Sequence, residues 1–235
     1  MKKIILISFI LNSITFSQIN GERFSVFFGG DYITSSQIFL NPNSSDIVIR
    51  NESFEIVDLF APSIDVRYRL YDEMLIGLGT EYISQSAIGP NATVIEGSQI
   101  RQIEVEDGVV FIPIELSIHY LMPFSTESFS FTMSGGIGYY LGSHTRILGD
   151  TEIENISKNN AIGLLVSLGM EYRFYNQFGA RLDMKFRDPE IKITSKYKSE
   201  IVNYKGRQLR IQQNEFDTKV NLNGISFLLG FTYHF

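Results

Sequence analysis

The stretch QFGARLDMKFR, residues 177–187, alternates between apolar side chains and charged or small ones. One face carries Phe178, Ala180, Leu182, Met184 and Phe186, and the other carries Gly179, Arg181, Asp183, Lys185 and Arg187. Successive side chains of a β-strand point to opposite faces, so this period of two predicts a strand between two unlike environments. A slip of one residue would move three cations to the apolar side, so the register of this strand is strongly specified.

Seven further segments show the same alternation: 23–32, 57–70, 74–83, 109–121, 128–142, 160–174 and 224–235. Each reaches the roughly 9 to 11 residues that a tilted strand needs to cross a bilayer. Short links (71–73, 122–127, 175–176) alternate with long ones (33–56, 84–108, 143–159, 188–223). This predicts an all-β fold, a transmembrane antiparallel up-and-down barrel of eight strands with turns at one rim and loops at the other. Ten strands is the alternative, because the last long link could add a hairpin.

Aromatic residues gather at the strand ends on the apolar side. At the short-turn rim these are Phe24, Tyr68, Tyr120, Phe129, Tyr172, Phe174, Phe178, Tyr233 and Phe235. At the long-loop rim they are Tyr32, Phe60, Tyr82, Tyr139, Phe186 and Phe227. Two aromatic girdles around an aliphatic band are typical of lipid interfaces, so we expect the apolar face to meet lipid. A soluble lipocalin-like barrel with its apolar face inside is the alternative.

The opposite face carries the charges and would line the lumen. The inward set is Arg23, Asp31 and Arg187 together with a predicted lumen charge network of Asp65, Arg67, Arg69, Glu81, Glu115, His119, Glu171, Arg173, Arg181, Asp183 and Lys185. An eight-stranded barrel is just wide enough for its own side chains, and buried charges must be paired. We therefore predict a filled, salt-bridged lumen with Glu171 opposite Arg181 across the turn at 175–176. A narrow water path along this plug is the alternative.

Three residues on the lumen face could suggest catalysis. Glu115, Ser117 and His119 alternate along one strand, and barrel enzymes that cleave lipids use a serine, a histidine and an acid. A lipid substrate does not easily reach the lumen side, and no oxyanion-hole pattern accompanies these residues. The three histidines fall on different segments without ligand spacing. We predict no catalytic residue, no metal site and no cofactor.

The N-terminal residues 1–17 read as a secretory signal peptide. Lys2 and Lys3 precede an apolar run from Ile4 to Leu11, and small residues precede Gln18. The alternative is a cytosolic protein with an apolar first strand. We expect a barrel domain over 18–235, whose formal net charge moves from −6 to −8 when two lysines and no acid are removed. Such an acidic chain is a poor nucleic-acid binder, and without Cys it has neither a lipidated Cys nor disulfides.

The four long links are where specific function would reside, so they are the candidate sites for a protein or surface ligand. Segment 188–223 carries seven bases against five acids, and its apolar residues on either side of Lys205-Gly206 suggest a hairpin above the membrane. Segment 84–108 is acidic, with Glu96, Glu104, Glu106 and Asp107 against Arg101. The opposite charges could pair with each other or form a partner surface.

Five stretches together resemble a known family: FIPIELSIHYLMP (111–123), SFSFTMSGGIGYYLG (128–142), GLLVSLGMEYRF (163–174), FGARLDMKF (178–186) and ISFLLGFTYHF (225–235). They resemble small outer-membrane β-barrel proteins of the PorT-like type, related in architecture to the OmpA and OmpW groups. The resemblance implies a Gram-negative outer-membrane barrel inserted by the barrel-assembly machinery, which reads a C-terminal strand ending in Phe. Tyr233 and Phe235 would form that assembly signal.

Some members of that family belong to a protein-secretion apparatus. Nothing follows the barrel in this sequence, so a cell-wall-binding role is not expected. We predict a non-enzymatic envelope protein with a structural or interaction role. The alternatives are a narrow pore or carrier for small or apolar solutes and, third, a lipid-modifying barrel enzyme.

Overall fold

The computed structural model describes residues 22–235, so the predicted signal peptide at 1–17 lies outside the described residues. The elements in chain order are β1 (Phe24–Phe39), α2 (Ile47–Asn51), β2 (Ser53–Tyr71), β3 (Met74–Glu81), β4 (Ile83–Glu96), β5 (Gln99–Leu121), β6 (Phe129–Leu148), β7 (Thr151–Asn159), β8 (Ala161–Tyr175), β9 (Phe178–Arg187), β10 (Glu190–Tyr197), β11 (Ile201–Tyr204), β12 (Arg207–Ile211), β13 (Glu215–Asn221) and β14 (Ile225–His234). No helix among the described residues is long and apolar enough to cross a membrane.

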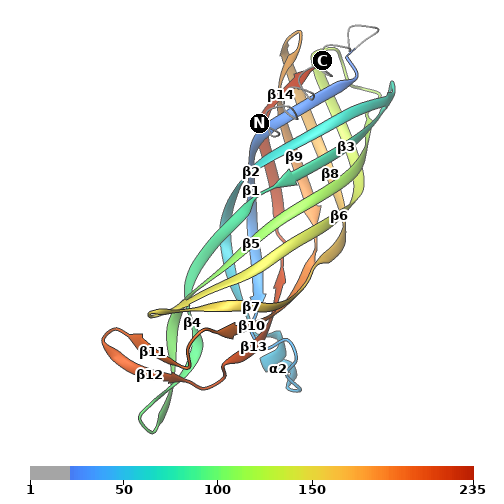
Figure 1. The fold of residues 1–235 in the computed structure, drawn as a ribbon. Coiled ribbons are helices and arrows are strands. Elements are labelled where there is room, and N and C mark those ends of the chain that lie inside the picture. The colour runs from blue at the N-terminus through green and yellow to red at the C-terminus, as the bar shows by residue number, and fades with distance from the viewer. Residues whose placement is uncertain (1–21) are drawn as a thin grey trace, which may run out of the picture.

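The antiparallel pairings run in a closed ring through β1, β2, β3, β5, β6, β8, β9 and β14 (Figure 1). The first and last strands close this ring over nine residue pairs, from Ser25 opposite His234 to Ile33 opposite Ser226. Backbone hydrogen bonds between Phe24 and Phe235 extend the seam at 3.0 and 2.9 Å. Closure leaves no unpaired strand edge within the ring, as a bilayer requires.

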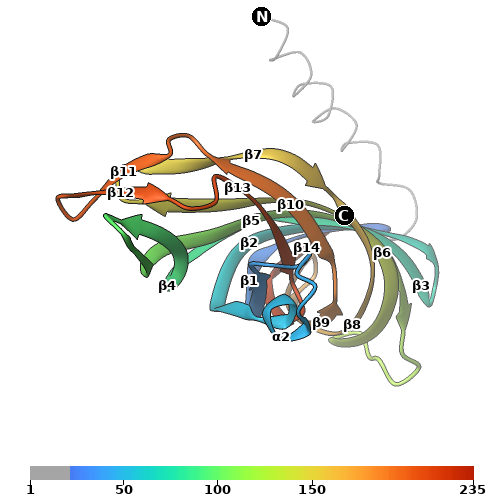
Figure 2. The ribbon, with the colours of Figure 1, turned by 90° about the horizontal axis from the view of Figure 1, so that it is seen from below.

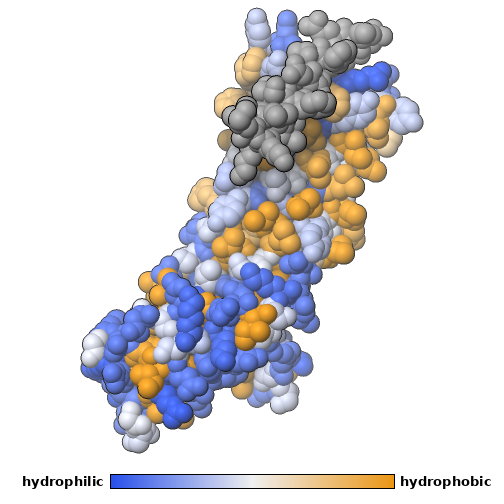
Figure 3. Space-filling model, in the orientation of Figure 1, coloured by the Kyte–Doolittle hydropathy of each residue, from blue (hydrophilic) through white to orange (hydrophobic). Residues whose placement is uncertain are grey.

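The apolar faces of the ring point outward, away from the lumen. Ile162 and Leu164 are 79% and 76% exposed, whereas Arg181 and Arg187 on the neighbouring strand are 2% and 4% exposed. Figure 3 shows the resulting apolar surface across the upper half of the molecule and a mostly polar surface below it. Stacked or tilted aromatic pairs mark the short-turn rim, among them Phe129 with Tyr172 at 4.6 Å between ring centroids. The predicted orientation of the two faces is confirmed.

Most of the residues predicted as long loops are strands instead. β1, β2, β5 and β6 run on past the apolar band, and β4, β7, β10 and β13 join them in an extension at the long-loop rim, which is the rim predicted to be extracellular; we call it the extracellular extension. Seen from below in Figure 2, β4, β11 and β12 lie to one side of the ring. These segments form strands because each finds a neighbour to pair with, which composition alone does not show.

The hairpin predicted within 188–223 is present as β11 and β12. Its turn is at Lys205-Gly206, and both residues have positive φ angles of 50° and 81°. Glycine adopts such angles without the steric cost that a side chain imposes. The hairpin pairs with β4 in the extension, so it adds no strand to the membrane-spanning ring. The ten-strand alternative stays a prediction, because β10 and β13 of the same segment pair with each other and enter the sheet beside the outer end of β1.

Two clusters of buried apolar side chains lie beyond the charged part of the lumen, toward and within the extension. The first lies where the ring passes into the extension and includes Ile33, Phe111, Tyr140, Ile191 and Leu222. The second lies farther out, between β4, β5, β7, β10 and the β11–β12 hairpin, and includes Val94, Leu148, Tyr197, Val202 and Leu209. The extracellular extension therefore has a hydrophobic core of its own.

Candidate functional site

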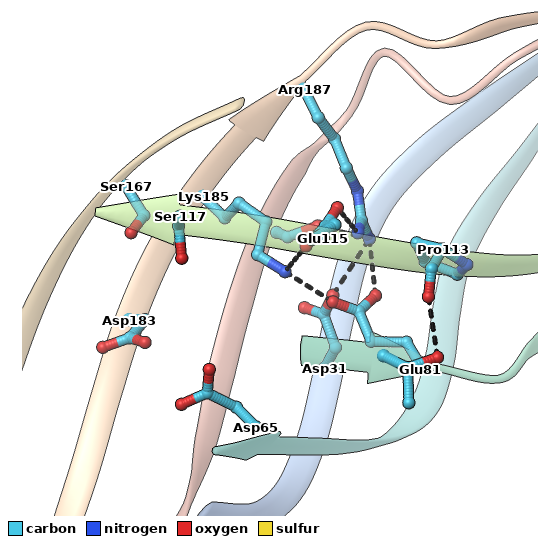
Figure 4. Close-up of polar contacts among 12 residues, drawn as sticks. Asp31, Asp65, Glu81, Pro113, Glu115, Ser117, Ser167, Asp183, Lys185 and Arg187 are labelled. Atoms are coloured by element: carbon cyan, nitrogen blue, oxygen red, sulfur yellow. Dashed lines mark hydrogen bonds and ion pairs between the residues drawn. The ribbon is translucent and has the colours of Figure 1, made fainter. Parts of the chain in front are cut away.

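The centre of the lumen is filled by two cations and three carboxylates (Figure 4). The guanidinium of Arg187 contacts Glu81 through Nη2 at 2.7 Å, Glu115 through Nη1 at 2.9 Å and Asp31 through Nη2 at 3.2 Å. The Nζ atom of Lys185 lies 2.6 Å from both Glu81 and Glu115. All five side chains are buried. A buried ion pair offsets the cost of removing its charges from water only when each charge has its partners and hydrogen bonds. We call these residues the central cluster.

The strand register brings the central cluster together. Arg187 and Lys185 are two residues apart on β9 and therefore share its lumen face. Their carboxylate partners Asp31, Glu81 and Glu115 come from β1, β3 and β5. The cluster thus joins four strands of the ring through contacts across the lumen. Asp31 and Arg187 belonged to the predicted inward set but were left out of the predicted network, although the geometry gives them central positions.

The central cluster does not balance in charge. Asp31, Glu81 and Glu115 supply three acidic groups, against the two basic groups of Lys185 and Arg187. The second carboxylate oxygen of Asp31 is buried and has no hydrogen-bond partner among the described residues. Because an unpaired buried charge is very costly, one of the three acids is expected to be neutral.

A second cluster lies next to it, toward the short-turn rim. Arg67 contacts Asp65 at 2.9 Å and Asp183 at 2.8 Å, and Arg181 contacts the same two carboxylates at 2.7 and 3.2 Å. The guanidinium of Arg181 also lies 4.0 Å from the centre of the Phe27 ring. Two acids and two bases balance here. Phe27 faces the lumen by the same alternation that places Asp31 there, and sequence reasoning overlooked it.

Three more predicted network residues, Arg69, Glu171 and Arg173, lie at the short-turn mouth of the lumen. Arg173 pairs with Glu22 at 2.9 Å and donates to His234 Nδ1 at 3.3 Å, and His234 Nε2 lies 2.5 Å from Glu171. Arg69 donates to the Asp72 carbonyl at 2.9 Å. Arg69, Glu171, Arg173 and His234 line a cavity of about 350 Å³. Glu171 lies directly opposite Arg181 in the strand register, and both side chains line this cavity, although their salt-bridge partners are other residues.

Farther into the lumen the cavity space is much smaller. Between the two charge clusters lies a cavity of about 30 Å³, room for about one or two waters. Small residues allow this tight filling: a Cβ on Gly169 would collide with Asp183, and one on Gly138 would lie 2.5 Å from the Tyr140 hydroxyl. Tyr140 itself is fully buried and donates to Glu115 at 3.1 Å.

The three residues considered for catalysis do not form a triad. Ser117 Oγ lies 2.8 Å from His119 Nε2, but the other ring nitrogen of His119 has no hydrogen-bond partner among the described residues. Glu115, the expected acid, is bonded to Lys185 and Arg187 instead. His119 is 3% exposed. The geometry lacks the acid that would orient the histidine and lacks access for a substrate.

A buried polar cluster in the extracellular extension was missed by sequence reasoning. Asp107 receives hydrogen bonds from His144 Nε2 at 2.8 Å and from Arg146 Nε and Nη2 at 2.6 and 3.0 Å, and Arg146 Nη1 donates to the Tyr197 hydroxyl at 3.2 Å. Asp107 and His144 are both 0% exposed. They were assigned to solvated loops because the segments around them look polar. The alternation of Val105, Asp107 and Val109 on one face of β5 was the available signal.

The environment of this extracellular cluster shifts its acid–base chemistry. Burial opposes ionisation of Asp107, but the hydrogen bond from His144 and the charge of Arg146 outweigh it and lower the pKa from 3.8 to about 2. Burial also lowers the pKa of His144 below its ordinary value of 6.5, with Arg146 acting in the same direction. The folded protein therefore holds an Asp107 anion beside a neutral His144 at neutral pH.

The oppositely charged segments 84–108 and 188–223 do pair with each other. Arg207 on β12 contacts Glu96 at the end of β4 at 3.1 Å, and the backbones of β12 and β4 are hydrogen-bonded there. Asp107 pairs instead with Arg146 of segment 143–159. Ion pairs between the segments thus involve two of the acidic side chains of segment 84–108, Glu96 and Asp107.

Structural comparison shows the class of the fold. The crystal structure of the outer membrane protein OprG from Pseudomonas aeruginosa superposes with a TM-score of 0.62 at 15% identity, covering 92% of this chain and 96% of that one. The crystal structure of Ail, the attachment invasion locus protein of Yersinia pestis, gives a TM-score of 0.49 at 10% identity over 92% of this chain and 100% of that one. The outer membrane protease OmpT from Escherichia coli gives 0.46 at 7% identity over 93% and 99%.

No family model matches the chain, and no curated protein sequence matches it. The likeness to OprG shows that the chain has the fold of the small outer-membrane β-barrels. The predicted fold class and outer-membrane setting are thereby confirmed. The narrower resemblance to PorT-like proteins stays a prediction.

Proposed function

We propose that this protein is a non-enzymatic, plugged outer-membrane barrel that acts through its extracellular extension as a structural or interaction protein of the cell envelope. The central cluster is the observation that carries the proposal. Five buried, mutually bonded charged side chains occupy the lumen, and ion pairs of this kind hold a fixed arrangement because removing any partner leaves a charge unpaired.

The extracellular extension supports the second half of the proposal. It has its own apolar core and buried polar cluster, so it presents a folded surface rather than mobile loops. A barrel that only anchored itself in lipid would not need such an extension. Within this framework the predicted PorT-like relationship, and with it a link to a protein-secretion apparatus, is the finer proposal.

Single-channel recording in planar bilayers tests the plugged lumen. The wild-type barrel should give no stable conductance above the background of protein-free bilayers. A double variant, Lys185→Ala with Arg187→Ala, removes both cations and much of the central filling, and it should conduct if it folds. A stable current from the wild type would contradict the proposal and favour the alternative of a narrow pore or carrier.

A co-purification experiment tests the interaction role. The full barrel, extracted in mild detergent, is compared with a variant in which the β11–β12 hairpin, residues 199–212, is replaced by a short Gly-Ser turn. Envelope proteins that bind the extension should be retained by the first and lost by the second. Retention of the same proteins by both would remove the extension from the proposal.

A further inference from the structure

All four extracellular segments meet at one cavity of about 220 Å³ in the extension. Asn41 comes from the first segment, Gln102 from the second, Arg146 from the third, and Tyr197 and Phe216 from the fourth. These segments lie far apart in the sequence, and the closure of the barrel brings them to one place. We propose that this cavity binds a single uncharged sugar unit, which deepens the proposed interaction role and rests on it.

The floor of the cavity is aromatic and apolar. The rings of Tyr197 and Phe216 lie 5.4 Å apart and tilted, and Phe216 keeps part of its surface exposed. Leu40 and Ile211 add aliphatic surface. A sugar ring presents a face of C–H groups that packs against such a surface, whereas a free ion or a fully polar solute does not.

Most of the polar residues that line the cavity carry uncharged hydrogen-bonding groups. The exposed amides of Asn41, Gln102 and Gln213 line it, together with the Thr93 hydroxyl and the Glu52 carboxylate. An amide both donates and accepts, so it matches a hydroxyl group, which also does both. The combination of an aromatic floor and an amide rim fits a ligand with one apolar face and a ring of hydroxyls.

The arginine in the cavity does not favour an anion. Arg146 already binds both oxygens of Asp107 and the Tyr197 hydroxyl, and its guanidinium lies 4.7 Å from the centre of the Phe216 ring. Its charge is therefore compensated, and its role is to position the two aromatic rings of the floor. A phosphate or sulfate group would find no uncompensated cation here.

Saturation-transfer difference NMR tests the site on the full chain. The barrel is kept in a zwitterionic detergent, because sugar-headed detergents would compete. The probes are glucose, galactose, mannose and N-acetylglucosamine, each alone, with phenylalaninamide as a ligand that offers an aromatic ring without hydroxyls. At least one sugar should show saturation transfer from the protein, and phenylalaninamide should not displace it.

Variants decide whether the signal comes from this cavity. Phe216→Ala should weaken sugar binding about tenfold, and Gln102→Ala, an exposed change that should not disturb folding, about threefold to tenfold. The matched control Gln208→Ala alters an exposed glutamine on β12 outside the cavity and should change nothing. No transfer from any of the four sugars, or equal binding in Gln102→Ala and Gln208→Ala, would overturn the sugar site. The plugged barrel would stand in that case, because its own test is conductance.

Discussion

Arg187 on β9 reaches across the lumen to Glu81 on β3, and the 2.7 Å contact between Nη2 and Oε2 joins two residues 106 positions apart in the chain. The same guanidinium contacts Glu115 and Asp31, so one side chain serves three carboxylates. Its own exposed side-chain surface is 0%. Removing it would leave three acids with Lys185 as the only cation of the cluster.

Arg187→Met should therefore destabilise the barrel strongly. Breaking a buried ion pair by removing one partner costs about 3–5 kcal/mol, because the remaining charge stays buried and unpaired. The measurement is the urea midpoint of unfolding in lipid vesicles. Arg207→Met is the control, since Arg207 makes an exposed pair with Glu96 that should contribute little. Equal midpoints for the two variants would show that the central cluster does not hold the barrel together.

Asp31→Asn should be tolerated better than Glu81→Gln. The ion pair of Asp31 with Arg187 is long, at 3.2 Å, and a neutral side chain in its place leaves two acids against two bases in the cluster. Glu81 binds both cations at 2.6 and 2.7 Å, so the NH₂ group of a glutamine there would face Lys185 or Arg187. We expect little change or a gain for Asp31→Asn and a loss of about 1–3 kcal/mol for Glu81→Gln.

Infrared spectroscopy provides the second measurement for this pair. The wild type should show the C=O stretch of a buried protonated carboxylic acid, and Asp31→Asn should remove it. If the band persists in Asp31→Asn and disappears in Glu81→Gln, the neutral group is Glu81 instead. If the wild type has no such band, all three acids are ionised, and the inference that one of them is neutral is wrong.

The period of two made the orientation of the ring predictable. Each misplacement of Arg181, Lys185 or Arg187 on the lipid face would cost about 2–4 kcal/mol near the midplane, so the sequence is under strong constraint there. Which side chains contact each other across the lumen was not predictable. Lys185 binds Glu81 and Glu115, which lie on strands that are not its neighbours, and alternation places residues on a face without naming their partners.

The strands of the extracellular extension could not be predicted from the sequence for a different physical reason. On β2 both Ile56 and Leu59 are buried although they are three residues apart, and between them Asp58 has a φ of 57°. The alternation therefore changes phase where the strand leaves the membrane, and a strict period of two stops there. His144 and Asp107 are buried by segments that fold over them, which local composition does not report.

Phe235→Ala should slow assembly of the barrel. Phe235 stacks on Phe24 at 5.8 Å and on Tyr233 at 5.9 Å, so it completes the seam between the first and last strands. The control is Phe227→Ala, a phenylalanine on the same strand at the other rim. Folding is followed by the heat-sensitive gel mobility of the barrel in vesicles with and without the barrel-assembly machinery. A recognition signal requires a delay that appears only with the machinery, while an equal delay in both would reduce Phe235 to a packing residue.

Acid should loosen the extracellular extension before it affects the ring, because His144 is buried there in its neutral form. Burial lowers the pKa of His144 in the folded state below its ordinary value of 6.5, so below that pH the unfolded state binds a proton that the folded state does not. Stability is therefore lost as the pH falls below 6.5, by up to about 1.4 kcal/mol per pH unit. Protonation of Asp107 removes further stability only at lower pH, as the pH falls from the ordinary pKa of 3.8 to the lowered pKa of about 2.

Hydrogen exchange of β7 and β10, expressed as protection factors at about pH 7 and pH 5 on either side of the ordinary His value, measures this loss. Protection in these strands should fall at the lower pH while protection in β8 and β9 stays constant. His144→Gln keeps a side chain that can donate to Asp107 but has no group that titrates in this range. Its extension should show equal protection at both pH values. A pH-dependent loss that persists in this variant would place the sensitive group elsewhere.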